Sequence, residues 1–296
     1  MKNRIAICLL FAVFASCCGC AKKKEETLCL EQVVRKNETT FICTFDGIER
    51  KILLDLPEQT EDAPLVFLLH GYGGSAEGFR TSVHFEEEAN ALGYGVVYVE
   101  GLSNPGDATS SSGWNSGISS TGNRDKEFLV ALAEYLQKEY LFDKDRTYAV
   151  GFSNGAFMTQ RLAMEASDTF SAVVSVAGMM PERVWKARNK KNEVSVFQIT
   201  GEKDAVVPKH SDGSAEYALA PAIEDVMEYW AESNNLGTVA EETIGKNSVL
   251  SKYGSENGKT QVWHLFVKDG YHSWPETDIN GIDMNCLILE FFEELK

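Results

Sequence analysis

Residues 146–164, RTYAVGFSNGAFMTQRLAM, decide how this chain folds. Residues 146–150 are typical of a short strand, and residues 156–164 are typical of a helix. Between them lies a Gly-x-Ser-x-Gly sequence at residues 151–155. A strand that turns directly into a helix brings backbones into contact, so side chains at the two flanking positions would clash. The stretch therefore predicts a strand–turn–helix unit that lifts the Ser153 hydroxyl above the C-terminal edge of a sheet.

Strand-like and helix-like segments alternate along most of the chain. The expected strands are residues 39–45, 48–56, 65–69, 95–99, 146–150, 172–176, 194–199 and 261–267, and the expected helices are residues 77–92, 127–140, 156–164, 222–233 and 283–294. This alternation predicts an α/β fold with a mainly parallel sheet and helices on both faces. Asp46-Gly47 between the first two strands predicts an antiparallel hairpin at the N-terminal edge. We expect one catalytic domain over residues 39–296, without a lid domain.

Residues 1–20 are predicted to be an export signal. A basic start, MKNR, precedes an apolar run at residues 5–15 that is too short to span a bilayer. Cys17 and Cys20 follow small residues, as in the bacterial lipobox, whose cysteine is acylated, and either one fits that pattern. Residues 21–38 are then a tether and the start of the fold. We expect an exported lipoprotein held at a membrane, on the periplasmic side or the cell surface, with a secreted protein as the alternative.

The charge of the chain limits its partners. The formal net charge is −16, and an acidic surface repels phosphate backbones, which argues against nucleic acid as a partner. A neutral or weakly charged substrate fits better. Beyond the signal region no C-x-x-C or H-x-x-x-H spacing supports a metal site, so we expect neither a metal nor another cofactor.

Three cysteines lie beyond the signal region. Cys29 and Cys43 flank the N-terminal strand pair, and export would allow a disulfide between them, although the sequence does not set their separation. Cys286 lies in an apolar helical stretch, where we expect a buried thiol.

A serine nucleophile needs a base within hydrogen-bond reach and a carboxylate that orients the base. In a fold with this turn the chain order is serine, acid, histidine. His272 lies between the last expected strand and the last expected helix, which is the place for the base. Asp204 follows the strand at residues 194–199 and is the predicted acid, with Glu202 as its rival by position.

The amides that would stabilise an oxyanion are expected from two places. One is the backbone N–H of Asn154, directly after the nucleophile, and the other comes from the glycine-rich loop at residues 70–75. In that loop we assign the second donor to the N–H of Tyr72. His70 precedes the turn, and we expect it to have a structural role.

Four ordered segments resemble one known family. They read HGYGGSAEGF at residues 70–79, DKDRTYAVGFSNGAFM at 143–158, GEKDAVVP at 201–208 and GYHSWP at 270–275. Together they are similar to the polyhydroxybutyrate depolymerase and feruloyl esterase family of secreted or surface α/β-hydrolases. The resemblance runs from about residue 40 to the C-terminus. It implies an α/β-hydrolase fold with Ser153 as nucleophile, Asp204 as acid, His272 as base, and the amides of Tyr72 and Asn154 as oxyanion donors.

The substrate is less well defined than the catalytic residues. The GWN sequence at residues 113–115 resembles a tryptophan loop of the family, and we expect Trp114 and Trp274 to stack on a sugar or a feruloyl ring. This favours feruloyl or acetyl esters on plant polysaccharide fragments. Hydroxybutyrate oligomers are the alternative ester, and a non-catalytic binding protein or a peptidase of the same fold are the alternatives in class.

Overall fold

The computed structural model describes residues 30–103, 111–118, 122–207, 221–254 and 258–295. Its strands are β1 (Glu31–Arg35), β2 (Thr40–Phe45), β3 (Ile48–Asp55), β4 (Leu65–Leu69), β5 (Gly95–Val99), β6 (Leu102–Ser103), β7 (Ser112–Gly113), β8 (Thr147–Phe152), β9 (Ala172–Val176), β10 (Ser195–Gly201), β11 (Thr238–Ile244), β12 (Ser248–Gly254) and β13 (Gln261–Val267). Its helices are α1 (Ala76–Val83), α2 (Phe85–Ala91), α3 (Asp125–Tyr140), α4 (Asn154–Glu165), α5 (Glu182–Lys186), α6 (Ile223–Ser233), α7 (Thr277–Asn280) and α8 (Met284–Glu293).

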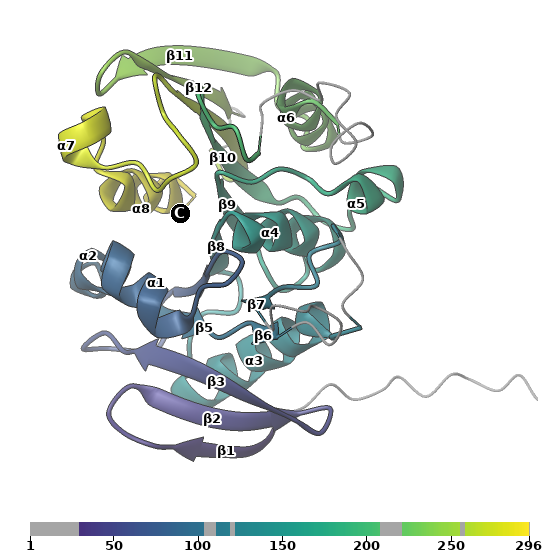
Figure 1. Cartoon of the computed structure of the whole chain (residues 1–296), viewed down its shortest axis with the longest axis vertical. Coiled ribbons are helices and arrows are strands. Elements are labelled where there is room, and N and C mark those ends of the chain that lie inside the picture. The colour runs from purple at the N-terminus through teal and green to yellow at the C-terminus, as the bar shows by residue number, and fades with distance from the viewer. Residues whose placement is uncertain (1–29, 104–110, 119–121, 208–220, 255–257, 296) are drawn as a thin grey trace, which may run out of the picture.

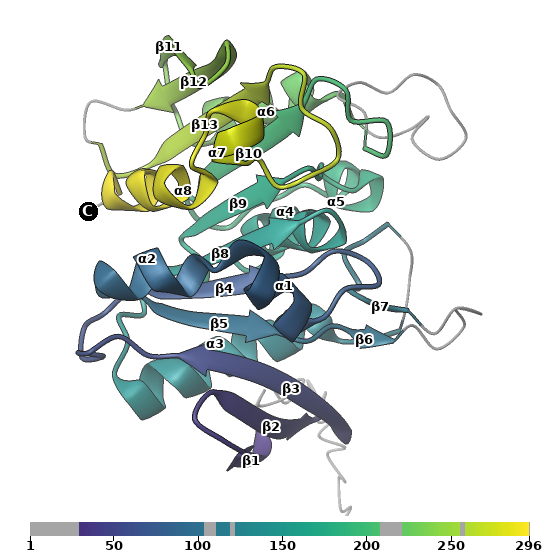
Figure 2. The same ribbon diagram turned by 60° about the vertical axis from the view of Figure 1, so that its left-hand side comes forward.

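One sheet of 11 strands forms the centre of the molecule, in the order β1-β2-β3-β5-β4-β8-β9-β10-β13-β12-β11 (Figure 2). The strands from β5 to β13 in this order are parallel to one another. The strands beyond them on each side are antiparallel. The predicted mainly parallel sheet with an N-terminal antiparallel hairpin is confirmed, and β11 with β12 forms a second antiparallel edge that the sequence did not reveal.

Helices cover both faces of the sheet, as predicted. Helices α1, α2 and α8 pack on one face of the sheet, and α3, α4 and α6 pack on the other (Figure 1). Each set of helices forms its own apolar core with the sheet. Alternate residues of the central strands enter alternate cores. In β4, for example, Phe67 belongs to the core beside α4, and its neighbours Val66 and Leu68 belong to the core beside α1. Strands β4 and β5 carry only aliphatic and aromatic side chains, as is typical of strands whose two faces are both covered.

The helix expected over residues 77–92 is two helices. His84 has a φ of 48°, in the left-handed region, and it ends α1 and begins α2. The His84 amide still donates to the carbonyl of Arg80 at 2.9 Å. The apolar pattern continues across this break because Val83 and Phe85 both face the same core, so the pattern alone did not show the break.

The ends of the fold also differ from expectation. The sheet begins at Glu31, inside the segment expected to hold the tether and the start of the fold. Cys43 is buried, whereas Cys29, Cys17 and Cys20 lie outside the described residues, so the disulfide and the acylation remain predictions. Cys286 is exposed, and the expectation of a buried thiol was wrong. The buried residues of α8 begin at Met284, and a position two residues further along a helix points to the opposite side.

Candidate active site

Ser153 lies at the tight turn between β8 and α4. Its φ is 52° and its ψ is −115°, a conformation that costs energy for any residue other than glycine. A Cβ atom on Gly151 would lie 2.2 Å from the carbonyl oxygen of Gly155, and one on Gly155 would lie 2.0 Å from the carbonyl oxygen of Leu69. Neither position can hold a side chain. The Ser153 amide also donates to the carbonyl of Val176 at 2.9 Å, which ties the turn to the next strand.

Ser153, His272 and Asp204 form one chain of hydrogen bonds. The Ser153 Oγ lies 2.9 Å from Nε2 of His272, and Nδ1 of His272 lies 2.8 Å from Oδ2 of Asp204. An ionised carboxylate can only accept, so Nδ1 carries the ring proton and Nε2 accepts from the serine hydroxyl. The other oxygen of Asp204 accepts the amides of Val206 and Val207, each at 2.8 Å. The Asp204 side chain is 1% exposed, and every bond it makes holds it toward the imidazole.

The sheet explains why three distant segments meet. Ser153 follows β8, Asp204 follows β10 and His272 follows β13, and these strands are parallel, so all three loops leave the same edge. Strands β10 and β13 are direct neighbours, with Gly201 paired to Val267 at their ends. The loop after β10, which carries Asp204 and is called the acid loop below, and the loop after β13, which carries His272 and is called the base loop, therefore leave the sheet side by side. Sites at the carboxyl ends of parallel strands are typical of open α/β sheets.

The glycine-rich loop after β4 is held in place by His70. The His70 ring donates from Nδ1 to the carbonyl of Gly71 at 2.7 Å, and its Nε2 accepts the amide of Gly101 at 2.9 Å. Burial lowers the pKa of His70 below its ordinary 6.5, which favours this neutral form. The Gly73 amide donates to the carbonyl of Ser112 at 2.8 Å. These contacts give His70 a structural role, while the oxyanion donors Tyr72 and Asn154 remain predictions.

Trp114 is buried and does not offer a ring face to a substrate. It is 2% exposed, its indole Nε1 donates to the carbonyl of His70 at 2.8 Å, and its amide donates to Oδ1 of Asn154 at 2.7 Å. The expected stacking role is therefore corrected to a structural one. Trp114 thus connects the glycine-rich loop at residues 70–75 to the first turn of α4. The sequence assigned Asn154 only a backbone role, and its side chain is an anchor that sequence reasoning missed.

A buried ion pair holds the segment around Trp114 and Asn115 in place. Asp125, at the start of α3, accepts the amide of Asn115 at 2.7 Å and lies 2.9 Å from Nη1 of Arg50. Both charged side chains are almost completely buried, and the guanidinium lies 4.0 Å above the ring of Phe128. Arg161 also donates to the carbonyl of Asn115. No sequence signal identified these residues, because each lies in a segment that reads as an ordinary strand or helix.

A groove of about 480 Å³ borders the glycine-rich loop at residues 70–75. The residues that line it include Gly71, Tyr72, Phe79 and Phe152. The Trp274 ring lies edge-on against Phe79, with the ring centroids 5.7 Å apart. Unlike Trp114, Trp274 is only partly buried, so its predicted contact with substrate stays a prediction.

Glu202, His210 and His264 also follow the serine turn in the chain and have side chains of the acid or base type. Glu202, the rival acid, contacts Lys268 rather than the imidazole, with 2.6 Å between Oε1 and Nζ. His264 lies within β13, and its Nε2 is 3.3 Å from Oγ1 of Thr200. His210 lies outside the described residues. Among the described residues, no cluster of three His, Cys, Asp or Glu side chains could hold a metal ion. No helix in the described part of the chain has the length and apolar character needed to cross a bilayer.

Comparison with known proteins gives relatives that share this fold. A model of the prolyl oligopeptidase family matches residues 83–193, which is less than half of the chain. NocK of Nocardia uniformis subsp. tsuyamanensis, provisionally named an esterase, is 35% identical over 173 residues, covering 56% of this chain and 47% of NocK. Feruloyl esterase B of Thermothelomyces thermophilus is 26% identical over 178 residues, covering 57% of this chain and 53% of the fungal protein. The chain thus spans about half the length of these curated relatives.

Solved structures of esterases have a similar fold. The acetyl xylan esterase from Aspergillus awamori superposes with a TM-score of 0.59 at 14% identity, covering 83% of this chain and 94% of the other. A carboxylesterase from Bacillus cereus superposes with a TM-score of 0.55 at 18% identity, covering 83% and 95%. At such identities the likeness concerns the fold alone. The chain is an α/β-hydrolase by fold, and its sequence resembles proteins named as esterases.

Proposed function

We propose that this protein is a serine esterase that hydrolyses carboxylic esters through an acyl-enzyme. The observation that carries the proposal is the hydrogen-bonded series from Ser153 through His272 to the buried Asp204. The sequence relatives named as esterases support the same class.

In the proposed mechanism, Ser153 Oγ attacks the ester carbonyl while Nε2 of His272 takes its proton. Asp204 keeps the imidazole in the tautomer that can accept that proton, and it stabilises the imidazolium that forms. The amides of Tyr72 and Asn154 donate to the oxyanion, a type of interaction worth about 3 kcal/mol per donor. His272 then protonates the departing alcohol. A water molecule, deprotonated by the same imidazole, releases the acid and restores Ser153.

Feruloyl or acetyl esters on plant polysaccharide fragments are the substrates that we propose. Two of the relatives are named feruloyl esterase and acetylxylan esterase, and the groove beside the glycine-rich loop is lined in part by Tyr72, Phe79 and Phe152. Aromatic rings bind sugars and phenolic rings through their faces. Hydroxybutyrate oligomers remain the alternative substrate.

The test of the esterase proposal is hydrolysis of p-nitrophenyl acetate by the full chain and by Ser153→Ala. We expect the variant to lose at least about 10⁴-fold in kcat, as for other triad nucleophiles. The control is Ser251→Ala, which removes a hydroxyl from β12 and should leave kcat unchanged. Equal activity of Ser153→Ala and wild type would exclude Ser153 as the nucleophile. A wild-type chain inactive on every ester would favour the binding protein.

The substrate is tested with methyl ferulate, acetylated xylo-oligosaccharides and hydroxybutyrate oligomers. We expect the highest kcat/KM on one of the first two. Activity on the hydroxybutyrate oligomers alone would contradict the plant ester assignment and leave the serine esterase mechanism intact.

A peptidase is the second candidate, because a prolyl oligopeptidase family model matches residues 83–193. The same triad can cleave amides. Proline-containing p-nitroanilide peptides separate the two functions. We expect no measurable cleavage of these amides at enzyme concentrations that hydrolyse the acetyl ester within minutes, and efficient cleavage would favour the peptidase.

For location, we propose an exported lipoprotein acylated at Cys17 or Cys20. The support is the sequence alone, since both cysteines lie outside the described residues. Labelling of cells with a radioactive fatty acid tests this, and Cys17→Ser and Cys20→Ser variants identify the acylated residue. An unlabelled mature protein would contradict the anchor and favour secretion.

A further inference from the structure

Two exposed ion pairs join the loop that follows β10 to the loop that follows β13. Glu202 Oε1 lies 2.6 Å from Lys268 Nζ, and Lys203 Nζ lies 2.6 Å from Asp269 Oδ1. Each loop carries one anion next to one cation, and each charge faces its opposite on the other loop. The second carboxylate oxygen of Glu202 accepts the amide of Asp269 at 3.0 Å. Glu202 thus binds the other loop through both a side chain and the backbone.

The backbones of the two loops also touch. The Glu202 amide donates to the carbonyl of Val267 at 3.0 Å, and the Lys203 amide donates to the carbonyl of Gly270 at 2.7 Å. A Cβ atom on Gly201 would lie 2.7 Å from that same Gly270 oxygen. The close approach therefore requires a glycine at position 201. These contacts fix the first residues of each loop, just before Asp204 on one side and just before His272 on the other.

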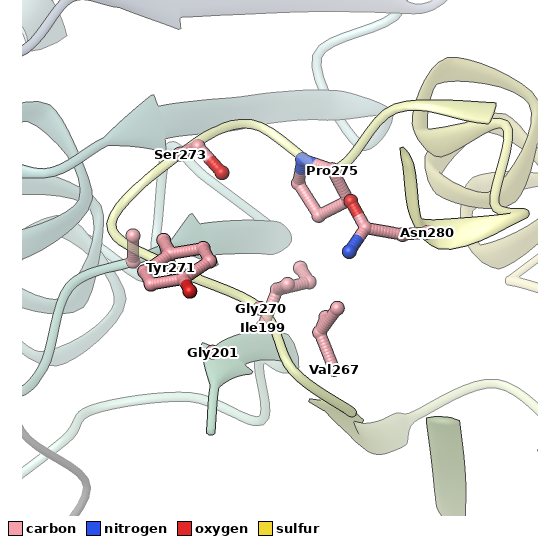
Figure 3. A pocket seen from close by; sticks show the side chains of 9 residues that line it. Ile199, Gly201, Val267, Gly270, Tyr271, Ser273, Pro275 and Asn280 are labelled. Atoms are coloured by element: carbon pink, nitrogen blue, oxygen red, sulfur yellow. The ribbon is translucent and has the colours of Figure 1, made fainter. Parts of the chain in front are cut away.

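A small cavity lies under the loop that carries His272. Figure 3 shows this cavity with Tyr271 and Pro275 on its loop side and Val267 on its strand side. The cavity holds about 10 Å³, which is room for roughly one water molecule. Tyr271 itself is 64% exposed, whereas Gly270 and Pro275 are buried. The bonds to the loop after β10 therefore add to the packing that holds this loop.

We propose that Glu202 is a positioning residue, which together with Lys268 holds the base loop against the acid loop and so sets the distance between His272 and Asp204. The inference rests on the proposed serine esterase function. Glu202 does not touch the reacting atoms, and it acts through the backbone of the loop that carries His272. This explains why an acidic residue at this position looked like a rival acid in the sequence: it lies on the correct loop but faces the other partner.

Exposed single ion pairs contribute little to the stability of a fold, so the expected effect is on geometry rather than on folding. A small displacement of a catalytic group lowers kcat without weakening substrate binding to the same degree. We expect Glu202→Ala to lower kcat on p-nitrophenyl acetate three- to tenfold with KM changed less than twofold. Glu202→Gln keeps an oxygen that can accept the Asp269 amide, and it should retain more activity than Glu202→Ala.

Rescue by charge exchange separates positioning from a general effect of charge. Glu202→Lys alone sets two cations against each other and should be the least active variant. Adding Lys268→Glu restores opposite charges across the loops and should make the double variant more active than Glu202→Lys. Its activity should stay below that of the wild type, because a lysine at position 202 cannot accept the Asp269 amide. The control is Asp168→Ala, which removes the carboxylate of another exposed ion pair, 3.5 Å from Lys191, in the connection from α4 to β9. It should keep the wild-type kcat.

A second measurement needs no substrate and so distinguishes failure of this inference from failure of the esterase proposal. The Nδ1 proton of His272, shared with Asp204, gives a downfield proton resonance that reports their hydrogen bond. We expect this resonance in the wild type, an upfield shift or loss in Glu202→Ala and Glu202→Lys, and a partial return in the charge-exchanged variant. Wild-type kcat and an unchanged resonance in Glu202→Ala would overturn the inference, and so would a charge-exchanged variant that is no more active than Glu202→Lys.

Discussion

Ser153 and the pair of Asp204 and His272 reach the same point of the molecule by different means. The serine turn is fixed by backbone contact, since a Cβ atom on Gly155 would lie 2.0 Å from a carbonyl oxygen. The acid and base loops are fixed by hydrogen bonds, as when Asp204 accepts two backbone amides through one oxygen. The difference teaches that Ser153 is placed by close packing of backbones, within its own turn and against Leu69 of β4, whereas Asp204 and His272 are placed by hydrogen bonds. Substitutions should therefore have different consequences on the two sides.

The largest effect is expected on the side that depends on hydrogen bonds, in Asp204→Asn. The side-chain oxygen of an asparagine can still accept the amides of Val206 and Val207. Its NH₂ group would then take the place of the oxygen that faces the imidazole. That group donates, and it would force the ring proton of His272 from Nδ1 to Nε2, where it cannot accept from Ser153. We expect a loss of about 10⁴-fold in kcat with p-nitrophenyl acetate, while the melting temperature changes by only a few degrees. A loss below tenfold would contradict the role of Asp204.

At the serine turn, which depends on backbone contact, Gly155→Ala should lower the stability of the fold before it affects catalysis. The added methyl group meets the carbonyl of Leu69, so β4 and α4 must separate. We expect the free energy of unfolding to fall by about 3 kcal/mol or more, as measured by urea denaturation. The control is Gly254→Ala, where a Cβ atom would meet no atom within 4 Å. Equal stability of the two variants would show that the turn is not fixed by backbone contact.

The buried His70 is expected to make the free energy of unfolding depend on pH. Burial lowers its pKa below the ordinary 6.5, so the unfolded chain takes up a proton that the folded chain resists. Stability from this group is complete above about pH 6.5 and is lost as the pH falls, by at most about 1.4 kcal/mol per pH unit. Urea unfolding of wild type and His70→Gln at pH 5.5 and pH 8 measures it.

We expect the variant to lose part of this pH dependence and the control His84→Gln to keep it. His84 has a side chain that is 57% exposed. Protonation of His70 in the folded chain would remove the acceptor for the Gly101 amide. Because the pKa of His70 is lowered in the folded chain, any resulting loss of esterase activity should appear only at a pH below that at which the stability begins to fall. A pH dependence of stability that is identical in wild type and His70→Gln would exclude His70 as its source.

The smallest loss of kcat is expected for Asn154→Ala. The catalytic role proposed for Asn154 belongs to its backbone amide, which alanine keeps. The lost side chain leaves the buried amide of Trp114 without its acceptor at 2.7 Å, a change that costs about 1–3 kcal/mol. We expect a decrease in stability of that size and a two- to fivefold decrease in kcat. Ser116→Ala, which removes a longer bond of 3.3 Å to Asn154, should have the smaller effect on both quantities.

Much of the fold could be predicted because most residues of the central strands are apolar and nearly all of them are buried. The bounds of β9 and β13 match the expected residues 172–176 and 261–267. Prediction failed at the edges of the sheet. Strand β11 is largely exposed and carries Glu241 and Glu242, so it has no apolar pattern, and its pairing with β12 alone makes it a strand.

The sequence by itself indicated the turn at Ser153, because the two glycines that it requires lie close together in the chain and one steric contact, between Gly151 and Gly155, is local. It also indicated the order of nucleophile, acid and base. Only the tertiary structure decided that Asp204 rather than Glu202 faces His272, because both lie on one loop and the choice depends on Lys268, far along the chain. The burial of Trp114 was likewise decided by its distant contacts, since a tryptophan in a polar loop reads the same whether its ring is exposed or enclosed.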